Sequence, residues 1–111
     1  MKARLTKIAE ADIERVMVWY EQRREGLGGR FHNRAMQAIE KIKQSPLGHS
    51  KVIKNARKVE LQKFPYALWY IVEPDESVVI GCLHGKRDRI LAKERALGVL
   101  EMPTPKEPTP G

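Results

Sequence analysis

The sequence has one cysteine, Cys82, and no long apolar run, and each shortage excludes a class of protein. A single cysteine cannot form an intrachain disulfide, and it leaves metal sites short of thiolate ligands. No apolar run approaches the roughly 20 residues that span a bilayer, and residues 1–4 lack the apolar segment of a secretory signal. We therefore expect a cytoplasmic protein with no metal and no small-molecule cofactor.

Two short stretches of the chain are rich in glycine or proline, and neither is expected to belong to a helix or a strand. Gly28 and Gly29 lack a preceding strand and the Gly-Lys-Ser/Thr ending of a phosphate-binding loop, so they indicate a turn. Residues 102–111 contain four prolines and almost nothing apolar, which predicts a disordered tail. The rest of the chain, residues 1–101, is long enough for one domain with one hydrophobic core.

Positive charge is the most informative property of the composition. The net charge is +7, with 21 Lys and Arg residues against 14 Asp and Glu residues. The whole excess lies in two segments: residues 51–63 contain five basic residues and one acidic residue, and residues 84–95 contain five and two. Such clusters predict an anionic partner, either nucleic acid or an acidic protein segment.

Two amphipathic helices joined by a short break are predicted in the first half of the chain. Over residues 9–24 apolar side chains recur every three or four positions, and Thr6 is a suitable N-cap. The same period begins again near Arg30 and is stopped by Ser45-Pro46. A short glycine-rich break between two such helices indicates an antiparallel hairpin. Trp19 lies beside the apolar face of the first helix, which predicts a core side chain.

Strands are predicted on both sides of the helical hairpin. Residues 2–5 are a candidate first strand, and around Val59 apolar and charged residues alternate as in a half-buried strand. Residues 66–72 and 78–83 are rich in β-branched, aromatic and aliphatic residues and flank a Pro-Asp-Glu turn, which predicts a β-hairpin. The first of these two strands is apolar on both faces and should be central. A short helix is expected over residues 90–100.

The strand over residues 78–83 leads straight into a cationic turn. Strict alternation along it places four side chains on one face: Val78, Ile80, Cys82 and His84. A lysine and two arginines follow at once: Lys86, Arg87 and Arg89. The sheet that supplies the core is therefore expected to present these charged residues at its rim.

Several short words of the sequence occur together in one known family. They are Ala11-Asp12-Ile13 and Trp19-Tyr20, Leu27-Gly28 with Phe31, Phe64-Pro65-Tyr66 with Trp69-Tyr70, and His84-Gly85-Lys86-Arg87-Asp88. On these words residues 1–97 resemble the RelE/ParE family of toxins from bacterial and archaeal toxin–antitoxin pairs. The resemblance implies an α+β fold, in which an N-terminal helical hairpin packs on a twisted antiparallel β-sheet of three to four strands with a short C-terminal helix.

The family carries two activities on one fold, so the resemblance implies two candidate functions. In the RelE-like branch the toxin enters the ribosome and cleaves messenger RNA without a metal, using the substrate's 2′-hydroxyl as the nucleophile. On this hypothesis Arg87 is the phosphate clamp, and His84 and Lys93 complete the catalytic set. Arg57 and Lys58 hold the RNA backbone. Lys93 stands where that branch has a tyrosine, which departs from the nuclease pattern.

The ParE-like branch has no nuclease centre and poisons DNA gyrase by binding it. A His-Gly-x-Arg-Asp word is common there and matches His84, Arg87 and Asp88, so we favour this branch. We therefore expect a toxin that contacts its target through cationic side chains: Arg57, Lys58, Lys86, Arg87 and Arg89. On either toxin hypothesis the partner is a cognate antitoxin that neutralises the basic rim.

A third hypothesis, from a different class, is a small basic RNA-binding module without toxicity. Aromatic and basic side chains such as Trp69, Tyr70 and Arg87 can stack on bases and hold phosphates. A gene for a short acidic or amphipathic antitoxin next to this one would distinguish a toxin from such a module.

Overall fold

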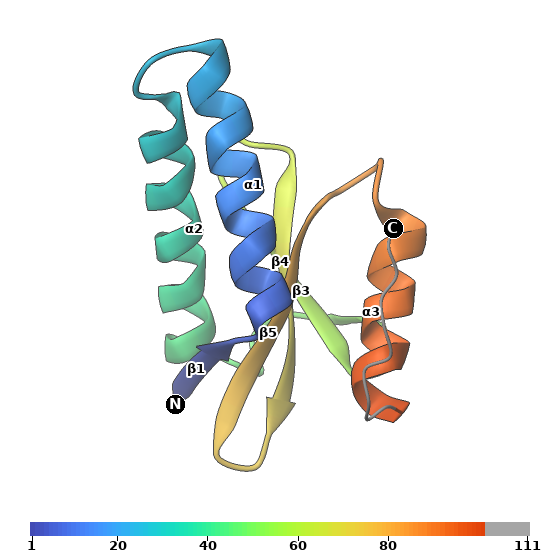
Figure 1. Ribbon diagram of the computed structural model, residues 1–111. Coiled ribbons are helices and arrows are strands. Elements are labelled where there is room, and N and C mark those ends of the chain that lie inside the picture. The colour runs from blue at the N-terminus through green and yellow to red at the C-terminus, as the bar shows by residue number, and fades with distance from the viewer. Residues whose placement is uncertain (102–111) are drawn as a thin grey trace.

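The computed structural model describes residues 1–101, which form three helices and five strands (Figure 1). In chain order they are β1 (Lys2–Leu5), α1 (Lys7–Arg23), α2 (Leu27–Gln44), β2 (Lys51–Ile53), β3 (Ala56–Glu60), β4 (Tyr66–Glu73), β5 (Glu76–His84) and α3 (Arg89–Glu101). The predicted tail, residues 102–111, lies outside the described residues. Within residues 1–101 no helix is both long enough and apolar enough to cross a membrane.

The strands form one mixed sheet in the order β1-β5-β4-β3-β2. β4 is central, as its two apolar faces predicted, and it pairs antiparallel with β3 and β5. β1 pairs parallel with β5, and the helical hairpin with the rest of the sheet provides the long connection that parallel strands need. β2 pairs with β3 through a tight turn at Lys54, whose φ is 51°. The sheet therefore has five strands, where three to four antiparallel strands were expected.

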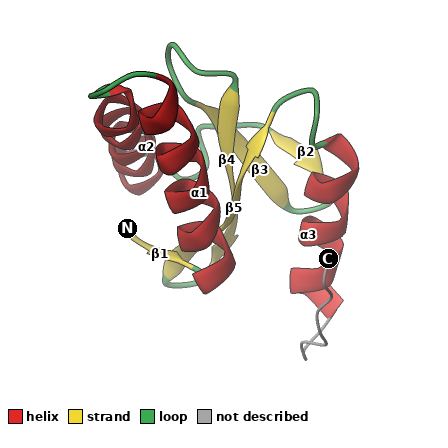
Figure 2. Ribbon diagram, turned by 45° about the horizontal axis from the view of Figure 1, so that its top comes forward, coloured by secondary structure: helices red, strands yellow, loops and turns green. Residues whose placement is uncertain are grey.

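The sheet separates two layers of helices (Figure 2). α1 and α2 cover one face, where the apolar sides of both helices pack on the sheet in a core that includes Ile13, Phe31, Ile42, Leu68 and Tyr70. α3 covers the opposite face with a smaller core that includes Ala92, Ala96, Trp69, Ile71 and Leu83. β5 therefore lies between the helical hairpin and α3.

A β-bulge in β5 reverses the alternation of its side chains. The pairing of β5 with β4 shifts between Val79 and Gly81, which leaves Ile80 as the extra residue. Ile80 faces α3, whereas Cys82 faces α1 and α2. The prediction of one continuous face is therefore wrong for the four residues Val78, Ile80, Cys82 and His84.

Local signals account for the ends of the two N-terminal helices. The Thr6 side chain accepts a hydrogen bond from Ala9 N at 3.1 Å, so Thr6 caps α1 as predicted. Gly26 has a φ of 88°, in the left-handed region that favours glycine. This residue turns the chain, so that α2 begins at Leu27 rather than near Arg30. The prediction that Gly28 and Gly29 form the turn is therefore wrong, because both lie in the first turn of α2.

Candidate functional site

The turn after β5, residues 84–88, is held by its own side chains, and we call it the rim turn. Asp88 Oδ2 accepts a hydrogen bond from His84 N at 2.8 Å. His84 Nδ1 accepts from the backbone N–H groups of Lys86 and Arg87, at 3.2 and 3.1 Å. Because Nδ1 is an acceptor in both bonds, Nε2 is the ring nitrogen that can meet a ligand. The rim turn is therefore pre-formed, and it fixes the orientation of His84.

Arg87 extends from the rim turn to Tyr66 at the start of β4. Its Nη2 donates to the Tyr66 hydroxyl at 3.0 Å, and its Nε lies 3.6 Å from Asp88 Oδ1. The hydrogen bond to Tyr66 raises the pKa of Arg87, so the guanidinium keeps its charge. The side chain is nevertheless 65% exposed. Its other N–H groups can therefore bind an anion.

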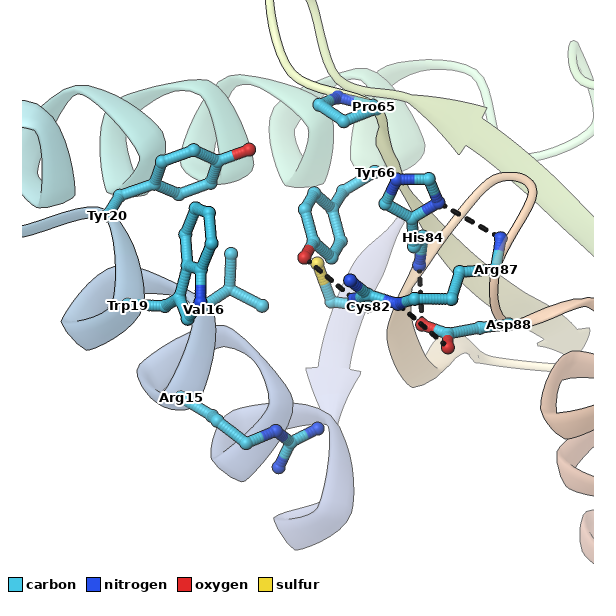
Figure 3. A pocket seen from close by; sticks show the side chains of 10 residues that line it. All are labelled: Arg15, Val16, Trp19, Tyr20, Pro65, Tyr66, Cys82, His84, Arg87 and Asp88. Carbon is cyan, nitrogen blue, oxygen red and sulfur yellow. Dashed lines mark hydrogen bonds and ion pairs between the residues drawn. The ribbon is translucent and has the colours of Figure 1, made fainter. Parts of the chain in front are cut away.

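A cavity of about 330 Å³ opens between α1 and the rim turn, and we call it the hairpin-side cavity. Figure 3 shows the side chains that line it: Arg15, Val16, Trp19, Tyr20, Pro65, Tyr66, Cys82, His84, Arg87 and Asp88. Trp19 is 47% exposed, so the prediction that it is a core side chain is wrong. Val16 and Tyr20 point into the core from the adjoining face of α1, which leaves Trp19 at its margin. Burial raises the pKa of the Tyr20 hydroxyl, and the neighbouring Tyr66 raises it further.

A larger cavity of about 690 Å³ lies on the other side of the rim turn, beside α3, and we call it the α3-side groove. Its lining contains an imidazole and five cationic side chains: His84, Lys58, Lys86, Arg87, Arg89 and Lys93. Trp69 also lines it, with Lys58 Nζ 5.6 Å from the centroid of its ring. The groove thus brings together the predicted catalytic set and every predicted target contact except Arg57.

Arg57 lies on the opposite face of the sheet from its neighbour Lys58, because it pairs across the strands with Tyr70 in the hairpin-side core. Its Nη1 donates to the His49 carbonyl at 2.6 Å. The Tyr70 hydroxyl donates to the Pro46 carbonyl at 2.6 Å, and burial raises the pKa of this hydroxyl. These bonds hold the loop between α2 and β2 on the sheet. The structure therefore separates Arg57 from the α3-side groove.

The most buried carboxylate, Asp12, was not predicted to belong to any site. It is 1% exposed and accepts hydrogen bonds from Arg15 Nη2 at 2.8 Å, Arg95 Nη1 at 2.8 Å and Cys82 N at 3.0 Å. Two sequence signals were available. Asp12 falls within the apolar face of α1, and Gly81 interrupts a strand, which often marks a bulge or a close approach.

The chemistry that these groups can perform is anion binding rather than nucleophilic attack. The Cys82 thiol lines the hairpin-side cavity, but burial and the nearby Asp12 raise its pKa to about 12, so it is protonated at neutral pH. Among the residues that the structure describes, no group of three or more His, Cys, Asp or Glu side chains is placed to hold a metal ion. The groups that remain for a ligand are His84 Nε2 and the exposed cations.

No protein-family model matches the chain, and no curated protein matches it. Among solved structures, the chain is similar to one in the chromosomal ParDE TA system from P. aeruginosa, with 19% sequence identity and a TM-score of 0.56. The similarity covers 76% of this chain and 95% of that one. The helical hairpin, the sheet and the C-terminal helix together therefore form a RelE/ParE-like fold, as the sequence resemblance implied.

Proposed function

We propose that the chain is the toxin of a type II toxin–antitoxin pair, that it inhibits growth in the cytoplasm by binding and poisoning DNA gyrase, and that a cognate antitoxin neutralises it. The observation that carries the proposal is the likeness of fold to a chain of the ParDE TA system, which extends over 95% of that chain. The cationic α3-side groove supports an anionic or acidic partner.

The bonding of the rim turn favours the ParE-like branch. His84, Arg87 and Asp88 match the His-Gly-x-Arg-Asp word, and they bond to one another or to the backbone of the same turn. A set of residues used in this way is a scaffold that presents its neighbours to a target. The neighbours presented here are the exposed Lys86 and Arg89.

A second candidate function, a ribosome-dependent messenger RNA endoribonuclease, is favoured by one specific observation. His84, Arg87 and Lys93 line the same groove, where an imidazole and two cations can move a proton and stabilise charge on phosphorus.

The third hypothesis, an RNA-binding module, depends on Trp69 and Tyr70 as residues that stack on bases. Trp69 is 7% exposed and Tyr70 is fully buried, so neither offers a ring face to a base.

Brief expression in a susceptible bacterium, with two assays on the same culture, tests the proposal. The first assay measures cleavage of a reporter messenger RNA on ribosomes, and the second measures gyrase-dependent DNA breaks with induction of the DNA-damage response. DNA breaks with intact RNA are expected. RNA cut at codon boundaries with intact DNA would establish the nuclease instead, and normal growth with neither lesion would overturn both toxin functions.

A further inference from the structure

The hairpin-side cavity lies along a part of the sheet edge that β1 does not cover. β1 pairs with β5 only as far as Leu5 opposite Val79, and the chain then turns into α1. Beyond that point side chains bind the outward backbone groups of β5. Cys82 N donates to Asp12 Oδ2 at 3.0 Å, and His84 N donates to Asp88 Oδ2 at 2.8 Å. A partner strand would find these donors occupied, so a partner must use the side chains of the cavity.

Two arginines reach this cavity from opposite sides, Arg15 from α1 and Arg87 from the rim turn (Figure 3). Each is 65% exposed and makes few bonds within the chain. Arg15 donates from Nη2 to Asp12, and Arg87 donates from Nη2 to Tyr66. The one carboxylate in the lining, Asp88, already accepts from the rim turn. Each guanidinium therefore has one carboxylate of the chain beside it, Asp12 or Asp88, and its remaining exposed N–H groups can bind an added anion.

Apolar side chains of α1 form part of the wall of the cavity, and one face of its exposed ring, Trp19, is covered. Trp19 is exposed, but the Arg23 guanidinium carbon lies 3.7 Å from the centroid of its ring and covers one face. Tyr20 packs on Phe31 and meets Trp19 edge to face. One ring face is therefore closed to a stacked base, and an aliphatic or aromatic side chain can pack against the part of Trp19 that stays exposed.

We propose that the hairpin-side cavity is an anchor site for a protein partner, which inserts an aspartate or glutamate between Arg15 and Arg87 and packs a neighbouring apolar side chain on Trp19. The proposal rests on the proposed function in one respect, that the partner is the neutralising antitoxin. It assigns recognition to a surface beside α1 that shares only three rim-turn residues with the α3-side groove: His84, Arg87 and Asp88. An acidic amphipathic segment has the chemistry that this surface selects.

The test is a titration of the whole chain, followed by the indole N–H and arginine side-chain signals in NMR spectra. The probes are a short leucine- and glutamate-rich peptide, the same peptide with every glutamate replaced by glutamine, and an oligouridylate. We expect the acidic peptide to shift the indole signal of Trp19 and leave that of the buried Trp69 in place. The glutamine peptide should bind about tenfold more weakly, because it cannot pair with the two guanidinium groups.

Three variants locate the site. Arg15→Gln and Trp19→Ser, at two residues that line the hairpin-side cavity and not the α3-side groove, should each weaken binding of the acidic peptide by about three- to tenfold. Lys41→Gln removes the same charge from an exposed position on α2 outside the cavity and should leave binding unchanged. Equal binding by all three variants would overturn the proposal, and a Trp19 shift produced equally by oligouridylate would make the cavity a nucleic-acid site. The titration measures peptide binding and not toxicity. Failure of the proposed function would therefore be seen in the expression experiment, separately from failure of this proposal.

Discussion

Arg95 of α3 reaches the edge of the sheet beside Gly81 and pairs with Asp12 of α1 in the opposite layer, with 2.8 Å between Arg95 Nη1 and Asp12 Oδ2. A Cβ atom at Gly81 would lie 2.5 Å from Arg95 Nη1, so the glycine leaves room for the guanidinium. Arg95 also donates to the Ile80 carbonyl at 3.0 Å, within the bulge of β5. Because α3 follows directly on the rim turn, this pair helps to fix where the rim turn is presented.

Replacement of Arg95 should destabilise the fold strongly. Arg95→Gln removes the more buried of the two guanidinium groups on Asp12, and because Arg15 and Cys82 N still bind the carboxylate we expect a cost of about 2–3 kcal/mol. Urea unfolding of the variant measures the change in the free energy of unfolding. The control is Arg4→Gln, which breaks a pair with Glu76 in which Arg4 is 55% exposed and should cost less than about 1 kcal/mol. Similar losses of unfolding free energy in Arg95→Gln and Arg4→Gln would show that the buried pair of Arg95 with Asp12 contributes little to stability.

Gly81→Ala should act through the same ion pair. The added methyl group displaces the Arg95 guanidinium from Asp12, and we expect a loss of about 1–3 kcal/mol in unfolding free energy. In an Arg95→Gln background most of this loss should disappear, because the shorter side chain no longer meets the methyl group. Gly29→Ala is the matched control: no atom lies within 4 Å of a Cβ there, so the variant should be more stable by about 0.5–1 kcal/mol. Strictly additive effects of Gly81→Ala and Arg95→Gln would contradict this explanation.

The parts of the fold that could be predicted are those with a strong local pattern. α1 and α2 have a helical period, α1 has a capped start, and β4 and β5 flank a turn of recognisable composition. β2 has only three residues, too few to show an alternation. The parallel pairing of β1 with β5 depends on contacts between distant segments, which no local pattern encodes.

The candidate site also has parts that a local sequence pattern predicts and parts that depend on contacts between distant residues. The rim turn lies within five consecutive residues, so its chemistry was visible in the sequence. The pairing of Asp12 with Arg95 joins residues 83 positions apart, and no periodicity indicates it. The bulge at Ile80 also defeats strict alternation, because one extra residue changes the face of everything after it. The prediction that Trp19 is a core side chain failed because Trp19 borders the apolar face of α1 and does not lie within it.

The Cys82 thiol should be almost unreactive in the folded protein. Burial and Asp12 raise its pKa from 9.0 to about 12, which lowers the thiolate fraction at pH 8 by about a thousandfold. Alkylation by iodoacetamide, followed by mass spectrometry, should be slow in buffer and fast in urea. The unfolded thiol loses its proton at a lower pH than the folded thiol, so this residue should also reduce stability as pH rises from 9.0 to about 12. Rapid alkylation under native conditions would contradict the burial of the thiol.

Substitutions in the α3-side groove should distinguish the two toxin activities. Arg87→Ala should lower growth inhibition on either activity, and because it removes one hydrogen bond to Tyr66 from a side chain that is 65% exposed, it should cost only about 0.5–1.5 kcal/mol of unfolding free energy. Lys93→Ala is more discriminating: a gyrase poison should keep its DNA breaks, whereas a nuclease should bind ribosomes and lose messenger RNA cleavage. His84→Ala should follow Lys93→Ala in cleavage, but it also removes an acceptor for two backbone N–H groups and loosens the rim turn. Lys41→Ala, an exposed charge on α2, is the control, and full toxicity of Arg87→Ala at equal expression would remove Arg87 from the site.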